Sequence, residues 1–182
     1  KRNLRDDDRH SHLTSEQLDQ LQLLIDKHAE LFDGTLGNMK GVFHRIITTK
    51  EEPIHITRFR KSHKHEEAEK KHIDDMLAKK VIKPSDSPFA APVVMAPKPR
   101  SDKLRFCVDY RELNKATVTD SYPMPRLDEC LDPLGGSQFF TAVDADSGYW
   151  QVQVHPDDVH KTAFSSRFGL YEFPSMPFGL KN

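Results

Sequence analysis

The sequence predicts an α+β protein with a helical N-terminal extension. Two segments, residues 14–32 and 62–80, carry apolar side chains at helical spacing. Three short runs, residues 93–96, 105–110 and 141–143, are apolar or β-branched and are bounded by turn-forming residues, as is typical of strands. The 182 residues suffice for one large domain with an extension.

The N-terminal region is expected to contain one capped helix. Residues 1–12 are highly charged, which predicts disorder. Thr14 and Gln17 have the spacing of a capping box. Asp33-Gly34 is expected to end the helix. Its apolar face would consist of Leu18, Leu21, Ile25 and Phe32.

Residues 62–80 predict a second helix. Residues 35–61 before it are expected to be irregular or to form short strands, with an alternating pattern around Phe43–Ile47. Glu66 with Lys70 and Glu67 with Lys71 are spaced as i,i+4 ion pairs. A narrow apolar stripe would place this helix against the core, as we also expect for the first helix. The stripe of the second helix consists of Ile73, Met76 and Leu77.

The middle of the chain predicts a hairpin followed by a helix. Four prolines between residues 85 and 99 exclude a helix there, and Val93–Ala96 is interpreted as a strand at a sheet edge. Arg105–Tyr110 would pair with it across a loop at Arg100–Lys103. Pro125 fits the first turn of a helix. That helix would carry Leu127, Cys130, Leu131 and Leu134.

The run FFTAVDADSGYWQVQV, residues 139–154, is the most informative part of the chain. Thr141–Val143 reads as a buried strand that ends in Asp144, and a carboxylate there is costly unless it binds something positive. Ser147 and Gly148 allow a close turn, with the Tyr149 ring beyond it. The alternative is an ordinary surface turn, which the local residues alone favour. Asp146 is interpreted as a solvated neighbour.

Charge is distributed unevenly although the formal net charge is only −1. Residues 58–115 hold an excess of Lys and Arg that would favour a polyanion, and residues 116–182 hold an acidic excess that would favour a divalent metal. The cations flanking the hairpin could hold phosphates or form a solvated basic loop, and both readings stay open. They are Lys98, Arg100, Lys103 and Arg105.

Composition also excludes some classes of protein. No apolar run approaches the roughly twenty residues of a membrane span, and no signal peptide is visible. Cys107 and Cys130 lack metal-site spacing and are expected to be core thiols in a reducing compartment. His63, His65 and His72 lack the spacing of a zinc site.

The order of the blocks is more specific than any one of them. They are HIDDMLAKKVIKPSDSPFAAPVVMAPK, LRFCVDYRELNKATVTDSYPMPRLDE and LGGSQFFTAVDADSGYWQVQVHPDDVHKTAFSSRFGLYEFPSMPFGLKN. Together they resemble the reverse transcriptase of gypsy-type LTR retrotransposons, part of their Pol polyprotein. The resemblance implies a right-hand polymerase fold with fingers and a partial palm over residues 62–182. Residues 13–61 would be a spacer after the protease, and residues 1–12 a tail.

The resemblance also implies roles for single residues. Asp144 would be the catalytic aspartate that binds two Mg²⁺ ions, with the Ala145 carbonyl on one of them. The residues facing the incoming nucleotide would be Lys98, Arg105, Ser147, Gly148, Tyr149 and Phe178. The two cations and the backbone amides of Ser147 and Gly148 would bind the triphosphate. Tyr149 would lie under the sugar and exclude a 2′-hydroxyl, and Phe178 would lie near the new base pair. Arg111, Asn114 and Gly179 would lie at the nucleic acid.

The implied activity is RNA-directed DNA polymerisation, a nucleotidyl transfer. The implied partners are an RNA or DNA template with a primer, deoxynucleoside triphosphates, and the protease, RNase H and integrase segments of Pol, within cytoplasmic virus-like particles. The sequence ends before the paired-aspartate motif, so the 182 residues alone are expected to be inactive. The alternative is a non-catalytic remnant that binds nucleic acid or a protein.

Overall fold

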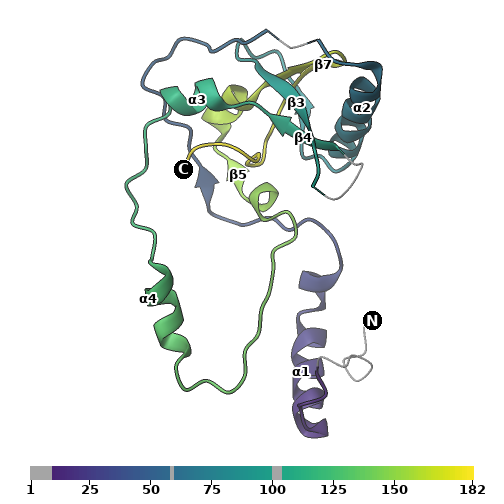
Figure 1. Cartoon of the computed structure of the whole chain (residues 1–182), viewed down its shortest axis with the longest axis vertical. Coiled ribbons are helices and arrows are strands. Elements are labelled where there is room, and N and C mark those ends of the chain that lie inside the picture. Colours follow the sequence, from purple (N-terminus) through teal and green to yellow (C-terminus); the bar gives the residue numbers. More distant parts are fainter. Residues whose placement is uncertain (1–9, 58–59, 100–103) are drawn as a thin grey trace. The chain divides into compact units, whose positions relative to one another are not determined.

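The computed structural model describes residues 10–57, 60–99 and 104–182 (Figure 1). The chain forms two compact units, the first ending at Gly37 and the second spanning Asn38–Asn182. The predicted spacer, residues 13–61, is therefore divided between them. Most of the predicted N-terminal tail, residues 1–9, lies outside the described residues.

The first unit contains helix α1 (Ser15–Lys27) and the short 3₁₀ helix η3 (Ala29–Phe32). The predicted capping box is confirmed, because the Gln17 amide donates to Thr14 Oγ1 at 3.3 Å and the Thr14 amide donates to Gln17 Oε1 at 2.9 Å. No residue of α1 is buried, so the expectation that its apolar face joins a core is wrong. Within the described residues nothing covers Leu23 and Leu24, which are exposed.

The second unit is built on a five-stranded mixed sheet with the order β2-β7-β6-β3-β4. The predicted hairpin is confirmed as β3 (Ala91–Pro97) antiparallel to β4 (Leu104–Val108), although its loop at Arg100–Lys103 lies outside the described residues. β3 is not an edge strand as predicted, because Ala91 and Pro92 pair in parallel with β6 (Phe164–Ser166). The remaining strands are β2 (Lys83–Pro84) and β7 (Gly169–Glu172).

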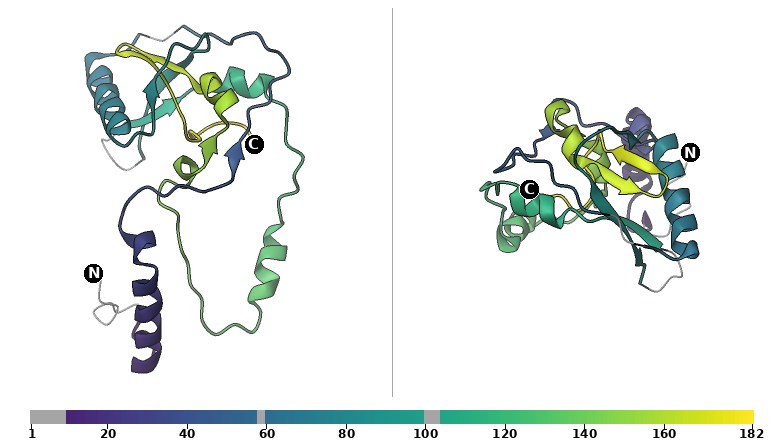
Figure 2. Two further views of the ribbon diagram at one scale, coloured as in Figure 1. Left: turned by 180° about the vertical axis from the view of Figure 1, so that it is seen from behind. Right: turned by 90° about the horizontal axis from the view of Figure 1, so that it is seen from above.

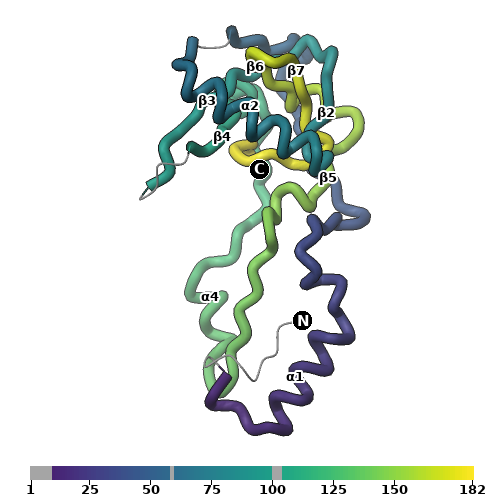
Figure 3. The backbone as a smooth tube through the Cα atoms, turned by 90° about the vertical axis from the view of Figure 1, so that its right-hand side faces the viewer, coloured from purple at the N-terminus to yellow at the C-terminus, as the bar shows by residue number. Residues whose placement is uncertain are grey.

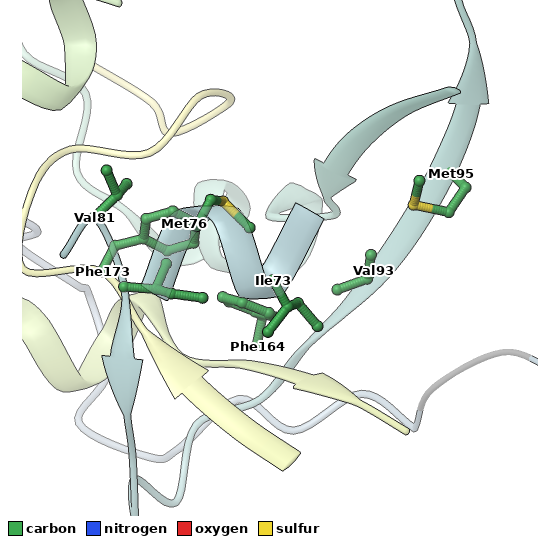
Figure 4. Close-up of a cluster of buried hydrophobic side chains, with 8 residues drawn as sticks. Ile73, Met76, Val81, Val93, Met95, Phe164 and Phe173 are labelled. Carbon is green, nitrogen blue, oxygen red and sulfur yellow. The ribbon is translucent and has the colours of Figure 1, made fainter. Parts of the chain in front are cut away.

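Helix α2 (His63–Ala78) covers this sheet through its predicted apolar stripe. Ile73 and Met76 are buried in one cluster with side chains from β3 and β6, and Figure 4 shows them facing the strands. The other buried members are Val81, Ile82, Val93, Met95, Phe164 and Phe173. This cluster is the larger core of the second unit, and it fixes the base of the β3–β4 hairpin.

The ion pairs predicted along α2 are wrong. Glu66 binds Arg167 of the β6–β7 turn instead of Lys70. Lys70 pairs with Asp74 at 2.7 Å, and Glu67 lies 3.4 Å from His63. Lys70 has an acidic residue four positions away on each side, so helical spacing alone allowed a pair with Glu66 or with Asp74. The β6–β7 turn decided the outcome, because it brought the Arg167 guanidinium to Glu66.

A second, smaller core lies beside helix α3 (Arg111–Ala116). Its buried members are Ile46, Tyr110, Leu113 and Val154. Strand β1 (Phe43–His44) pairs in parallel with β5 (Gln153–Val154), so residues 38–56 pack with the C-terminal third of the chain. In Figures 1 and 2, α3 and α2 lie on opposite sides of the five-stranded sheet.

Residues 118–146 form a long exposed stretch that carries α4 (Leu127–Leu131) and the 3₁₀ helix η4 (Asp132–Leu134), seen as a tube in Figure 3. The predicted strand at Thr141–Val143 is wrong, since these residues are extended coil and Val143 is 78% exposed. A strand needs a neighbour for its backbone hydrogen bonds, and the described residues supply none here.

The expectation that both cysteines are core thiols is also wrong. Cys107 lies on the outward side of β4, and Cys130 lies in α4, so both thiols are exposed. An apolar sequence context placed them in a strand and a helix but did not determine which side each faces. None of the described helices is both long enough and apolar enough to cross a membrane.

Candidate active site

A pocket of about 640 Å³ lies where the exposed stretch rejoins the packed part of the second unit. It is lined by the turn that follows Asp144 and by the segment before the C-terminus. The lining residues are Asp144, Ala145, Ser147, Gly148, Tyr149, Met176 and Phe178. Six of these seven were predicted as site residues, and the structure brings them together from two segments about thirty residues apart in the sequence.

The turn that forms one side of the pocket is tightly constrained. Ser147 has φ 49° and ψ 45°, a left-handed conformation that non-glycine residues rarely adopt. Its carbonyl accepts from the Trp150 amide at 2.8 Å, which starts the 3₁₀ helix η5 (Gly148–Gln151). A Cβ on Gly148 would lie 3.3 Å from the Ala145 Cβ, so this position favours glycine. Backbone strain of this kind is often found at functional sites.

The two aspartates of the turn differ in their contacts. Ser147 Oγ donates to Asp146 Oδ1 at 3.2 Å, and Gln151 Nε2 donates to the Asp146 carbonyl at 2.7 Å. The Asp144 carboxylate lines the pocket and has no hydrogen-bond or ion-pair partner among the described residues. Asp144 is therefore the carboxylate that a cationic ligand in the pocket would meet.

Part of the pocket lining is aromatic and joins its two segments. The Tyr149 and Phe178 rings meet edge to face with their centroids 5.0 Å apart, and Trp150 packs on Phe178 in the same way at 5.9 Å. Such contacts fix ring orientation more firmly than apolar burial alone. Tyr149 and Phe178 are each 53% exposed, so both rings still present a surface to a ligand.

The cations Lys98 and Arg105 lie apart from this lining. Arg105 pairs with Ala96 in the β3–β4 ladder, and Lys98 follows the last paired residue of β3. Both side chains are exposed and neither lines the pocket. His72 Nε2 of α2 lies 3.2 Å from the Leu104 carbonyl and ties the start of β4 to the helix.

The residues assigned to nucleic acid are held by partners within the chain. Arg111 forms a fork with Asp109, with Nε–Oδ1 at 2.8 Å and Nη2–Oδ2 at 2.6 Å. This hydrogen-bonded guanidinium holds the pKa of the Asp109 carboxyl below its usual range, and Asp109 in turn raises the pKa of Arg111. The Asn114 side chain binds the Gly179 carbonyl and the Lys181 amide.

The donors in the pocket fit part of a divalent metal site. The Asp144 carboxylate and the Ala145 carbonyl are hard oxygen ligands of the kind that Mg²⁺ prefers. Among the described residues, no three acidic, histidine or cysteine side chains converge in a metal-binding group. The described residues therefore offer one carboxylate toward such an ion.

Sequence reasoning missed Met176 as a lining residue. Met176 and Phe178 are two positions apart in a non-helical segment, and this spacing places both side chains on one side of the chain. That signal was present in the motif MPFGL but could not be used before the partner segment was known. Trp150 was also missed, and its ring packs on Phe178, which lines the pocket.

Comparison with known proteins agrees with this arrangement. Residues 96–182 match the family described as reverse transcriptase (RNA-dependent DNA polymerase). The chain is 35% identical over 178 residues to the retrovirus-related Pol polyprotein from transposon 297 of Drosophila melanogaster, covering 94% of this chain and 17% of that protein. It is 39% identical over 115 residues to the Pol polyprotein from transposon gypsy of the same species, covering 60% of this chain and 11% of that protein.

A shorter relative and a solved structure extend the comparison. An RNA-directed DNA polymerase homolog of Oenothera berteroana is 48% identical over 79 residues, which cover 43% of this chain and 56% of that protein. The prototype foamy virus protease-reverse transcriptase has a TM-score of 0.78 at 26% identity, covering 94% of this chain and 23% of that one. The expected α+β reverse transcriptase fold is confirmed by this likeness. The chain therefore belongs to the reverse transcriptase family, as a reverse transcriptase region of the retrotransposon Pol type.

Proposed function

We propose that this chain is part of an RNA-directed DNA polymerase and that the pocket binds the incoming deoxynucleoside triphosphate. The observation that carries the proposal is the lining itself, in which a carboxylate without a partner among the described residues, a tight turn and two aromatic rings border one space. The chain spans 17% of the transposon 297 polyprotein, so the activity, substrates and partners of a whole polyprotein are part of this proposal.

Reverse transcriptases in general use divalent metal ions. We propose two Mg²⁺ ions, with Asp144 and the Ala145 carbonyl as ligands from this chain. When bound, such ions stabilise the charge that develops on the attacking and leaving oxygens. A single carboxylate does not fix two ions, so further ligands would have to come from other residues of the polymerase.

The other lining residues would bind and orient the substrate. The amides of Ser147 and Gly148, at the start of the short helix η5, would donate to triphosphate oxygens. Lys98 and Arg105 would approach the same phosphates from the hairpin, Arg105 as a bidentate fork. The Tyr149 ring, oriented by Phe178, would lie under the sugar and leave no room for a 2′-hydroxyl.

The basic excess in residues 58–115 supports binding of a primer and an RNA or DNA template, because phosphate contacts contribute much of the affinity for nucleic acid. We further propose that the chain lies between a protease segment and RNase H and integrase segments of a Pol polyprotein. Its place of action would be a cytoplasmic virus-like particle. The matches to transposon polyproteins along almost the whole chain support this setting.

Sugar selection tests whether the pocket holds the nucleotide. In a polyprotein-length polymerase carrying these residues, Tyr149→Ala should raise the ribonucleotide-to-deoxyribonucleotide ratio of kcat/KM by about tenfold or more, since discrimination of one hydroxyl by fit is worth about 1–3 kcal/mol. Tyr122→Ala is the matched control, because Tyr122 is 81% exposed and does not line the pocket. An unchanged ratio in Tyr149→Ala would contradict the proposal.

A further inference from the structure

We propose that Asn114 is a positioning residue, whose side chain clamps the turn at Phe178 and Gly179 and thereby sets the aromatic side of the pocket. The inference rests on the proposed function, because it explains how a nucleotide pocket keeps its shape. It gives Asn114 a role different from the template contact that the family resemblance implies.

The nitrogen and the oxygen of the Asn114 side-chain amide each form a hydrogen bond with a main-chain group. Nδ2 donates to the Gly179 carbonyl at 2.8 Å, and Oδ1 accepts from the Lys181 amide at 2.9 Å. The two bonds bracket Leu180, which packs against the smaller core. A side-chain amide used in this way on both sides fixes a backbone segment in orientation as well as in position.

The clamped segment needs such support. Gly179 has φ +91°, in a region that residues other than glycine rarely adopt. Two further bonds tie the same segment to the residues that follow α3. Lys181 Nζ donates to the Thr117 carbonyl at 2.9 Å, and Asn182 Nδ2 donates to the Val118 carbonyl at 2.8 Å.

The base of the clamp is rigid. The backbone N–H of Asn114 donates to the Tyr110 carbonyl at 2.7 Å. Tyr110 is buried, and its hydroxyl donates to the Thr162 carbonyl at 2.7 Å. Leu113, next to Asn114 in α3, is buried in the same core. The clamp therefore connects the segment at Phe178 and Gly179 to a packed helix.

The clamped segment leads directly into the pocket. Phe178, immediately before Gly179, lines it and touches the rings of Tyr149 and Trp150. Asn114 does not line the pocket, so its effect on a bound nucleotide must pass through Phe178. Loosening the clamp should free the Phe178 ring and weaken nucleotide binding.

A spectroscopic test uses the 182-residue chain. Trp150 is its single tryptophan, so intrinsic fluorescence reports on the packing of Phe178. Asn114→Ala should increase acrylamide quenching of Trp150. Lys115→Ala should leave quenching unchanged, because Lys115 is 73% exposed and pairs only with Glu112 among the described residues. Unchanged quenching in Asn114→Ala would overturn the proposal.

A kinetic test uses a polyprotein-length polymerase. Asn114→Ala should raise the KM for deoxynucleotide about tenfold, the scale expected when one or two hydrogen bonds are lost, with an unchanged Kd for primer–template. A raised Kd with an unchanged KM would instead assign Asn114 to the template. Lys181→Met removes only the bond to Thr117 and should shift KM in the same direction if Asn114→Ala does not fold.

The two tests separate the inference from the proposed function. Increased quenching in the isolated chain supports the clamp even if the polymerase shows no activity, in which case the proposed function alone fails. A raised ribonucleotide-to-deoxyribonucleotide ratio in Tyr149→Ala, together with unchanged quenching in Asn114→Ala, would support the proposed function and overturn the clamp alone.

Discussion

Asp158 is a buried carboxylate that joins two distant parts of the chain. Its Oδ2 accepts from Arg45 Nε at 2.7 Å and from the Ile46 amide at 3.1 Å, and its Oδ1 accepts from Lys161 Nζ at 2.8 Å. Burial by itself would raise the pKa of Asp158, but the bonds from Lys161, Ile46 and Arg45 hold it below its usual range. The network fixes residues 45–46 to the 3₁₀ helix η6 (Pro156–Thr162).

Replacing Asp158 should destabilise the second unit. Asp158→Asn leaves Lys161 and Arg45 without their counter-charge, and breaking a buried pair of this kind costs on the order of 3 kcal/mol. The free energy of unfolding in urea at pH 7 measures the loss. Asp157→Asn is the control, because Asp157 is 73% exposed and should change stability little.

The pH dependence of this difference has a definite sign. Because the folded-state pKa of Asp158 lies below the unfolded value of about 3.9, its contribution is complete above that value. It is lost as the pH falls through the lower folded-state pKa. The difference between wild type and Asp158→Asn should therefore shrink when unfolding is measured at increasingly acid pH. A difference that stays constant down to the acid limit would show that Asp158 acts by packing alone.

At the scale of elements, the β3–β4 hairpin determines where Lys98 and Arg105 lie, the two cations that we propose as phosphate ligands. Its base is held by the larger core through Val93 and Met95, and the His72–Leu104 contact secures the start of β4. Arg105 follows Leu104 directly and stays exposed. The hairpin therefore presents a cation from a fixed strand, at a position that does not line the pocket of the free protein.

Arg105→Ala should impair nucleotide use without impairing template binding. A charged hydrogen bond to phosphate is worth about 1.5–3 kcal/mol, so kcat/KM for deoxynucleotide should fall by one to two orders of magnitude. Steady-state kinetics and a primer–template binding assay measure the two effects. The control is Lys115→Ala, an exposed cation outside the hairpin. The reverse pattern, weaker template binding with normal kcat/KM, would place Arg105 at the nucleic-acid backbone.

Elements with strong local signals were predictable from the sequence. The capping box of α1, the apolar stripe of α2 and the paired strands of the hairpin depend on residues a few positions apart, and each was found close to its expected bounds. The expected strand at Thr141–Val143 was not, because a strand exists only with a partner and the pattern of one segment cannot show whether that partner is present.

At the scale of the whole molecule, the pocket combines a turn at residues 144–149 with a segment at residues 176–178. The family resemblance identified most of the lining, because its motifs name the residues. It did not identify the contacts that hold them, such as the Asn114 clamp and the Trp150–Phe178 contact. Those contacts join segments far apart in the sequence and follow from the folded chain alone.

The two aspartates of the turn offer a matched pair of variants at this scale. Asp144 lines the pocket without a partner among the described residues, whereas Asp146 is bonded to Ser147. An aspartate-to-asparagine change keeps the shape of either side chain and removes its charge. Only the loss of charge at Asp144 should affect metal-assisted phosphoryl transfer.

The most direct measurement is template-dependent primer extension with Mg²⁺ by a polyprotein-length polymerase carrying Asp144→Asn or Asp146→Asn. We predict that Asp144→Asn lowers extension by several orders of magnitude with folding retained, while Asp146→Asn has a much milder effect. Near-normal extension by Asp144→Asn, or an equal loss in both variants, would contradict the assignment of this pocket as the catalytic site.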